Sequence, residues 1–275
     1  MSQPFTSSTT LHNGVSMPWL GLGVWKVTEE GQAEAAVLAA LETGYRSIDT
    51  AAVYNNEEGV GAALAATSVP RKEIFVTTKI WNAVQGYDTT LAAFEESRKK
   101  LGLEVVDLLL IHWPVKDKYK DTWRAMEKLY KEGHVRAIGV SNFQIHHLQD
   151  LMETCEIKPM INQVECHPLL TQEPLHAFCK ENQIQLTAWS PLMQGNLDLP
   201  VLTEIGAKYG KSAAQIVLRW DLQNGVVVIP KTVTPSRMKE NAEIFDFSLT
   251  DEEMAQISAL NQNKRFGADP DNFNF

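Results

Sequence analysis

The chain has 275 residues, of which 44% are hydrophobic, and a formal net charge of −9. That length is typical of one large α/β barrel domain, which can bury enough apolar surface to fold without disulfides or metal ions. The acidic balance argues against nucleic-acid binding, and no apolar run approaches the length of about 18 residues that predicts a membrane span. We therefore expect one soluble domain over residues 1–275.

Neither a secretory signal nor a disulfide framework is predicted. Residues 1–14 contain no basic stretch followed by an apolar run, which favours a cytoplasmic protein. The three cysteines, Cys155, Cys166 and Cys179, are an odd number without a CxxC pair, so we expect ordinary free thiols. We also expect a monomer that binds neither nucleic acid nor membrane.

No metal site is expected. His146 and His147 stand together early in a predicted helix. Adjacent helical positions are expected to point to different sides, and no carboxylate nearby in the sequence completes a ligand set. We therefore interpret the pair as surface residues.

Apolar runs of strand length alternate with stretches of helical periodicity along the chain. An Asn13-Gly14 hairpin signal comes first, and it is followed by a short strand near residues 20–22. Seven further strands are expected at Tyr45–Ile48, Ile74–Thr78, Val105–Ile111, Val135–Val140, Met160–Val164, Gln185–Ala188 and Val226–Ile229. Such continuous apolar runs are typical of parallel strands that are covered on both faces.

The alternation fits either a closed barrel or a doubly wound open sheet. The segment Gly21–Lys26 lacks the third glycine of the GxGxxG motif and leads into no immediate helix, which argues against the open sheet. The stretch Val201–Asn224 holds two helical segments where one would suffice. We therefore predict a (β/α)8 TIM barrel with an N-terminal β-hairpin and extra helices.

Polar residues follow the apolar runs at the point where each predicted strand ends. In a β/α barrel, the carboxyl ends of all strands meet at the face that carries the active site. The residues at these ends are Asp49, Lys79, His112, Ser141, Asn142, Gln163, Trp189, Ser190, Lys231 and Thr232, with Tyr54 five residues beyond the first of them.

Four of these residues suit the reduction of a carbonyl group. A lysine beside Tyr54 favours the phenolate and so lowers the pKa of the phenol, while Asp49 would keep Lys79 charged and in place. Tyr54 could then give a proton to a carbonyl oxygen, to which His112 could donate a hydrogen bond. No side chain can supply a hydride, so a nicotinamide must do so.

Several motifs together resemble the aldo-keto reductases over nearly the whole chain. They are the segment Gly44–Ala51 with Tyr54, Asn56, Glu57, Val60 and Gly61; then Thr78–Trp81, Ile111–Pro114, Gly139–Phe143 and Asn162–Glu165; and finally Ile229–Thr232 with Arg237, Glu240 and Asn241. The segments Trp189–Gly195 and Lys264–Asp271 are most similar to the bacterial 2,5-diketo-D-gluconate reductases. This resemblance implies a catalytic tetrad of Asp49, Tyr54, Lys79 and His112.

The resemblance also implies NADPH/NADP+ as cofactor. It assigns Ser141, Asn142 and Gln163 to the nicotinamide carboxamide, and Trp189 to stacking on the ring. Lys231 and Arg237 are expected at the 2′-phosphate, beside a helix that starts with a capping Thr234 and Pro235. The remaining cofactor-binding residues are expected to be Ser190, Leu192, Thr232, Val233, Thr234 and, near the adenine, Glu240 and Asn241.

The same resemblance places Trp25, Trp81 and Trp113 around the substrate, together with His112. Indole rings give an apolar wall with a hydrogen-bond donor, which suits small and partly polar carbonyl compounds. The expected substrates are 2,5-diketo-D-gluconate, 2-oxoaldehydes such as methylglyoxal, and β-keto esters.

Two other functions fit parts of the pattern. Lys79 at a strand end could be the nucleophile of a Schiff-base aldolase or lyase. Alternatively, the chain could be a nicotinamide-binding sensor subunit without turnover. Trapping of a substrate adduct by borohydride would indicate the first, and tight NADPH binding without turnover would indicate the second.

Overall fold

Parallel strands form the centre of the protein in a computed structural model that describes residues 6–275. They follow one another in chain order, and each is parallel to the next. These strands are β3 (Leu22–Gly23), β4 (Ser47–Asp49), β5 (Phe75–Ile80), β6 (Val106–Ile111), β7 (Val135–Ser141), β8 (Ile161–Glu165), β9 (Gln185–Trp189) and β10 (Val227–Val228).

Contacts between the first and last strands close this sheet into a barrel. Parallel bridges join Leu20 to Val228 and Gly23 to Lys231. The backbone N–H of Gly21 donates to the carbonyl of Val228 at 2.9 Å. The predicted (β/α)8 barrel is therefore confirmed, and it leaves no open edge between β10 and β3.

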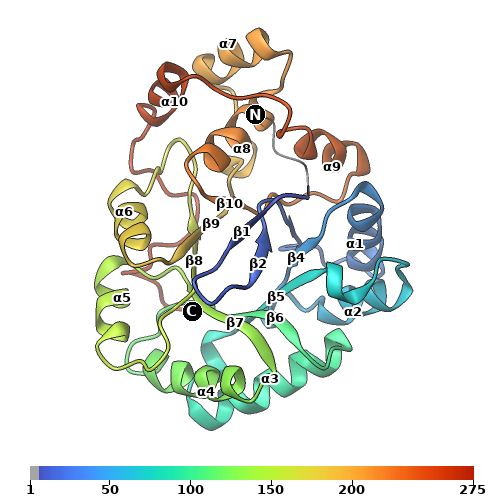
Figure 1. Ribbon diagram of the computed structural model, residues 1–275, viewed down its shortest axis with the longest axis vertical. Helices are drawn as coiled ribbons and strands as arrows, with labels where there is room; N and C mark the ends of the chain where they lie inside the picture. Colours follow the sequence, from blue (N-terminus) through green and yellow to red (C-terminus); the bar gives the residue numbers. More distant parts are fainter. Residues whose placement is uncertain (1–5) are drawn as a thin grey trace.

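A ring of helices surrounds the strands (Figure 1). The helices are α1 (Gln32–Thr43), α2 (Glu57–Ala66), α3 (Tyr87–Leu101), α4 (Tyr119–Lys131), α5 (Ile145–Met152), α6 (Glu173–Glu181), α7 (Pro200–Tyr209), α8 (Ala213–Gln223), α9 (Pro235–Ala242) and α10 (Asp251–Ser258). Four single-turn 3-10 helices, namely η1 (Ala52–Tyr54), η2 (Arg71–Glu73), η3 (Asn82–Val84) and η4 (Met193–Gly195), lie in the described loops. The two helices expected between β9 and β10 are α7 and α8, whereas α10 is an additional helix near the C-terminus.

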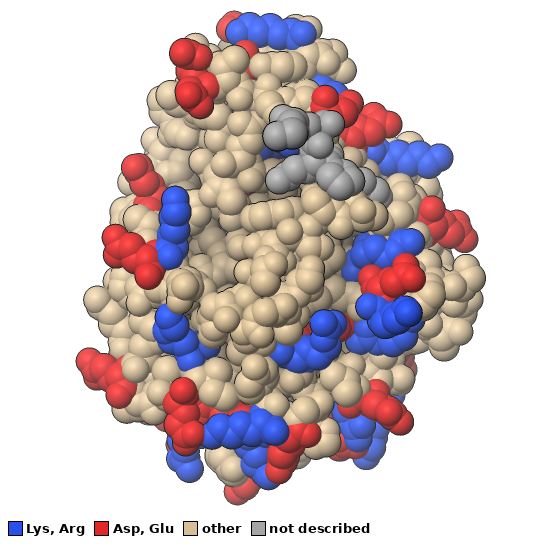
Figure 2. All heavy atoms as spheres, viewed as in Figure 1, with Lys and Arg blue, Asp and Glu red and all other residues tan. Residues whose placement is uncertain are grey.

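The predicted N-terminal hairpin consists of β1 (Ser8–Thr10) and β2 (Ser16–Pro18), which pair antiparallel. It crosses the amino end of the barrel (Figure 1): Asn13 donates to the backbone of Arg136, near the start of β7, and Thr9 donates to Gln185, the first residue of β9. The hairpin thus covers the end of the barrel opposite to the carboxyl rim. Figure 2 shows the face that carries the hairpin. Charged side chains of both signs are scattered around the periphery of this face and do not form one continuous patch.

The strands are buried on both faces, as their continuous apolar runs predict. Every residue of β5 and β6 is buried. Burying one leucine, isoleucine or phenylalanine side chain contributes about 1.5–3 kcal/mol, so these strands and their covering helices form a rigid frame. All three cysteines are free thiols, as expected. Over residues 6–275, the helices are too short or too polar for any of them to cross a membrane.

Candidate active site

Four side chains from separate parts of the chain meet at the carboxyl rim of the barrel. Asp49 is the last residue of β4, Tyr54 ends η1, Lys79 lies in β5 and His112 follows β6. The Lys79 ammonium donates to Oδ1 of Asp49, and its Nζ lies 3.5 Å from Oη of Tyr54. The ring centroids of Tyr54 and His112 are 5.7 Å apart. The structure therefore brings the four predicted tetrad residues together.

The Lys79 ammonium is buried beneath the site, with 1% of the residue exposed. Burial alone would lower its pKa, but the Asp49 carboxylate and the hydrogen bonds outweigh that effect and raise the pKa. Its third contact is a 2.9 Å hydrogen bond to the carbonyl of Thr50. Lys79 is therefore a fixed cation, a state in which an amine is a poor nucleophile.

The phenol of Tyr54 feels opposing influences. Burial raises its pKa, and Asp49 adds to the rise, whereas Lys79 lowers it through its charge and its hydrogen bond. The expected effect of Lys79 is present, but the net pKa is raised, because removing the phenolate from water costs more free energy than the lysine offsets. Tyr54 is thus protonated at neutral pH, as a proton donor must be.

The imidazole of His112 is neutral. Burial and the nearby Lys79 ammonium hold its pKa well below the usual value. Its Nδ1 is buried and has no hydrogen-bond partner among residues 6–275. A neutral imidazole carries one N–H, so His112 can donate one hydrogen bond to a ligand.

A cavity of about 580 Å³ lies over this cluster. Asp49, Tyr54 and His112 line it, whereas Lys79 lies below its floor. The predicted substrate-binding residues Trp25, Trp81 and Trp113 line it as well. A cavity of this size can take a small carbonyl compound beside the ring of a larger cofactor.

One wall carries the amides expected to bind a nicotinamide. Ser141, Asn142, Gln163 and Trp189 all line the cavity. The indole N–H of Trp189 donates to Oδ1 of Asn142 at 2.8 Å, and the amide of Gln163 donates to Oδ2 of Asp49 at 2.7 Å. Gln163 keeps one N–H and its carbonyl oxygen available within the described residues. A half-buried indole beside an amide that still has a free donor and a free acceptor fits a flat ring that bears a carboxamide.

The second predicted cofactor region is the start of α9. Lys231 is exposed and lines the cavity, and Arg237 is exposed in the first turn of α9. Thr234 occupies the N-cap position and Pro235 follows it, but among residues 6–275 no side chain caps this helix. The predicted helix start at Thr234 and Pro235 is confirmed, but Thr234 makes no capping hydrogen bond within the described chain, so the first backbone N–H groups of α9 keep their capacity to bind an anion.

Several predicted cofactor residues do not line the cavity. Ser190 is an exception: it lines the cavity and has a left-handed backbone conformation (φ 47°). Glu240 accepts a hydrogen bond from the hydroxyl of Ser212 at 2.5 Å. The predicted residues outside the cavity are Leu192, Thr232, Val233, Thr234, Arg237, Glu240 and Asn241.

The sequence-based prediction missed the C-terminal part of the wall. Phe266, Gly267, Ala268 and Phe275 line the cavity. Phe275 stacks on Trp81, with ring centroids 5.9 Å apart and an interplanar angle of 2°. The similarity of segment Lys264–Asp271 to known reductases was the available signal, but nothing local in the sequence indicates which residues it touches.

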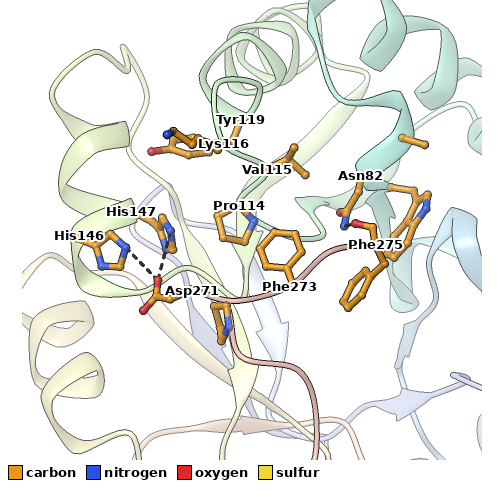
Figure 3. A pocket seen from close by; sticks show the side chains of 13 residues that line it. Asn82, Pro114, Val115, Lys116, Tyr119, His146, His147, Asp271, Phe273 and Phe275 are labelled. Carbon is orange, nitrogen blue, oxygen red and sulfur yellow. Dashed lines mark hydrogen bonds and ion pairs between the residues drawn. The ribbon is translucent and has the colours of Figure 1, made fainter.

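A second cavity, of about 830 Å³, shares the lining residues Trp81 and Phe275 with the first. Figure 3 shows this second cavity, with Phe275 at one end and His146 and His147 at the other. At its far end, the Nε2 atoms of His146 and His147 lie 3.1 and 3.7 Å from Oδ1 of Asp271. The two imidazole centroids are 4.0 Å apart. Contrary to the expectation from the sequence, the two imidazoles therefore do not diverge, and the C-terminal tail brings a carboxylate, Asp271, to them.

The hydrogen bonds of His147 place a proton on the nitrogen atom that a metal ion in this cluster would need as a ligand. The backbone N–H of Gln144 donates to Nδ1 of His147 at 3.1 Å. In a neutral imidazole the proton must then sit on Nε2, the atom that faces Asp271. Burial and the neighbouring His146 lower the pKa of His147 to about 4, which keeps it neutral. His147 therefore presents an N–H to the carboxylate, where a metal ion would need a lone pair.

Comparisons with known proteins agree with this site. Residues 19–262 match the model of the Aldo/keto reductase family. The chain is 59% identical to a glyoxal reductase of Bacillus subtilis over the full length of both proteins. It is 53% identical to the methylglyoxal reductase DkgA of Salmonella typhimurium, over 96% of each chain. A crystal structure of a variant of Gox0644 in complex with NADPH superposes with a TM-score of 0.93 at 43% identity, covering 98% of this chain and 99% of that one. The chain therefore belongs to the aldo/keto reductase family, whose members are oxidoreductases that use nicotinamide cofactors.

Proposed function

We propose that this protein uses NADPH to reduce the aldehyde or ketone group of small carbonyl compounds to an alcohol, with Tyr54 as the proton donor. The observation that carries the proposal is the meeting of Tyr54, Lys79, Asp49 and His112 at a cavity lined by three tryptophans. The substrate class includes 2-oxoaldehydes such as methylglyoxal, 2,5-diketo-D-gluconate and β-keto esters. Relatives named as glyoxal and methylglyoxal reductases support the 2-oxoaldehydes.

NADPH, when bound, supplies the hydride to the carbonyl carbon. Ser141, Asn142, Gln163 and Trp189 would hold its nicotinamide, while Lys231, Arg237 and the start of α9 would hold its 2′-phosphate. Tyr54 donates its proton to the carbonyl oxygen, and the Lys79 ammonium stabilises the phenolate that remains. Asp49 keeps that ammonium in place, and His112 donates a hydrogen bond to the same oxygen.

The aldolase alternative is less well supported. A Schiff-base lysine needs a neutral and accessible amine, whereas Lys79 is 1% exposed and paired with Asp49. Reduction of an adduct by borohydride would leave Lys79 modified if that alternative held. The sensor alternative would give NADPH binding without turnover.

Three further properties belong to the proposal. A single domain over residues 1–275 is supported by the family match over residues 19–262. A monomer is supported by the few large hydrophobic side chains exposed in the described chain, Trp25, Val105 and Phe275, of which two line the active-site cavity. A cytoplasmic location is supported by the three free thiols, which suit a reducing compartment.

Replacing Tyr54 by phenylalanine tests the mechanism. Tyr54→Phe removes only the acidic hydroxyl, so kcat/KM for methylglyoxal should fall by about 10²–10⁴-fold, while the Kd for NADPH from fluorescence titration stays near the wild-type value. Tyr87→Phe, at the start of α3 and outside both cavities, is the matched control and should keep full activity. Activity of Tyr54→Phe equal to that of the control would remove Tyr54 as the acid.

A further inference from the structure

We propose that Glu165 is a positioning residue that holds the C-terminal segment Phe266–Ala268 against Trp189 and thereby sets the wall on which the nicotinamide rests. This inference rests on the proposed NADPH-dependent function and adds a residue that acts on the cofactor through its neighbours. The residues involved lie about 100 positions apart in the chain.

Glu165 uses both carboxylate oxygens to hold the backbone of the tail. It is the last residue of β8, and its side chain is fully buried. Oε1 accepts the N–H of Phe266 at 2.6 Å, and Oε2 accepts the N–H of Gly267 at 3.1 Å. Burial would raise the pKa of this carboxyl, but these bonds and His167 outweigh that effect and lower it. Glu165 is therefore an anion that holds two consecutive amides, an arrangement stronger than neutral hydrogen bonds.

His167 supports the Glu165 carboxylate that holds the tail. Its side chain is also fully buried, and its Nε2 lies 3.0 Å from Oε1 of Glu165. Nδ1 has no hydrogen-bond partner among residues 6–275, so Nε2 is the ring nitrogen positioned to donate to the carboxylate. The ring centroid of His167 lies 5.4 Å from that of Phe266. The anchor thus holds both the backbone and the side chain of the tail.

The tail in turn touches the indole of Trp189. A Cβ atom added to Gly267 would lie 2.3 Å from Cη2 and 3.0 Å from Cζ3 of Trp189, so only glycine fits between Glu165 and the indole. At the opposite side of the indole, Nε1 donates to Asn142 at 2.8 Å. Trp189 is therefore held at both ends, by Asn142 and by the anchored glycine. Both Trp189 and Gly267 line the active-site cavity.

A variant at a second buried glutamate serves as the reference for losing a buried carboxylate charge away from the cofactor wall. Glu127, on α4, is also buried, and it accepts the backbone N–H groups of Glu156 and Ile157 at 2.7 and 2.8 Å, outside both cavities at the barrel mouth. Glu165→Gln and Glu127→Gln each replace a buried carboxylate that holds two backbone amides, but both amides at Glu127 donate to Oε1, so the glutamine oxygen there can still accept them. In Glu165→Gln, the new NH2 group would face the N–H of Gly267 and break that contact.

The experiment compares the thermal midpoint, the Kd for NADPH and kcat in both variants. We expect a lower midpoint in Glu165→Gln and a smaller change in Glu127→Gln, and only Glu165→Gln should weaken NADPH binding or turnover, by up to about 100-fold. Equal NADPH affinity and turnover in the two variants would leave Glu165 a structural residue and overturn the proposal. If the wild-type protein itself fails to oxidise NADPH with any carbonyl compound, the proposed function fails, which is a different result.

A second pair of variants covers the case in which Glu165→Gln does not fold. Gly267→Ala should raise the Kd for NADPH about tenfold in the wild-type background, because the methyl group displaces the indole. In a Trp189→Phe background the shorter ring leaves room, so the same change should have an effect of less than about twofold. Equal effects in the two backgrounds would show that the tail does not act through Trp189.

Discussion

Two buried carboxyl groups outside the active site have contrasting surroundings. Asp107, in β6, is 1% exposed and contacts the guanidinium groups of Arg71 and Arg136 at 2.5 and 2.6 Å. Asp221, in α8, is fully buried, and its Oδ2 has no partner among residues 6–275. Its Oδ1 lies 4.0 Å from the thiol of Cys166. An isolated buried carboxyl avoids the cost of charge by keeping its proton.

Asp221→Asn should stabilise the protein at neutral pH. Burial raises the pKa of Asp221 well above its ordinary value, so the folded state keeps a proton that the unfolded state loses above about pH 4. The contribution of Asp221 to stability is therefore complete at low pH and is lost as the pH rises toward the folded-state pKa, with a slope of up to about 1.4 kcal/mol per pH unit. Asparagine has nearly the same shape and no charge to avoid.

Urea unfolding from pH 4 to pH 8 checks this prediction. The variant should equal the wild type near pH 4 and exceed it increasingly toward pH 8. A stability difference that does not change with pH would mean that Asp221 does not titrate between the two states.

At the scale of elements, helix ends show which local signals are reliable. Helix α10 begins with a capping box in which Oγ1 of Thr250 accepts the N–H of Glu253 at 3.2 Å, and Glu253 accepts the N–H of Thr250 at 3.0 Å. Helix α8 begins in the same way at Ser212. By contrast, Thr234 stands at the start of α9 without such a bond. A threonine or serine thus caps these two helices where the side chain of the third helical residue accepts the backbone N–H of the capping residue.

Thr250→Ala should cost about 1 kcal/mol of unfolding free energy, because it removes one acceptor from the first turn of α10. Thr250→Ser keeps that acceptor and is the matched control, so it should lose only a small part of this amount. Urea denaturation at neutral pH measures both variants. An equal loss in the two would exclude the cap as the cause.

At the scale of the whole molecule, the C-terminal tail separates two cavities. Phe275 lies between Trp81, on which it stacks, and Trp113, whose ring centroid is 5.2 Å away at an angle of 88°. Asn82 holds the tail by donating to the carbonyl of Phe275 at 3.0 Å. Phe275 lines both cavities, of about 580 and 830 Å³, so we expect removal of its ring to enlarge the space beside the substrate.

Phe275→Ala should widen the substrate range. The preference for a bulky aromatic ketone over methylglyoxal, expressed as the ratio of kcat/KM values, should shift toward the ketone by about tenfold. Val105→Ala is the control, because Val105 is also an exposed hydrophobic residue but lines neither cavity. An unchanged ratio in Phe275→Ala would mean that this ring does not limit the substrate.

Local patterns determined the barrel and most of the tetrad's placement. Strand-length apolar runs record burial on two faces, and the residues that follow them must reach one rim because all the strands are parallel. Asp49, Lys79 and His112 could therefore be predicted from position alone. Tyr54 needed the family resemblance as well, because it lies in a loop beyond its strand.

The tertiary structure decided what depends on contacts between distant segments. Glu165 and Gly267, or His147 and Asp271, are separated by more than 100 residues, and no periodicity in the sequence links them. The net direction of the Tyr54 pKa also required the fold, since desolvation depends on every neighbour whereas the pairing with Lys79 depends on one. The sequence by itself thus determined the kind of chemistry through the residue types at the strand ends. Only the folded chain decided which distant residues line the cavity and hold its lining in place.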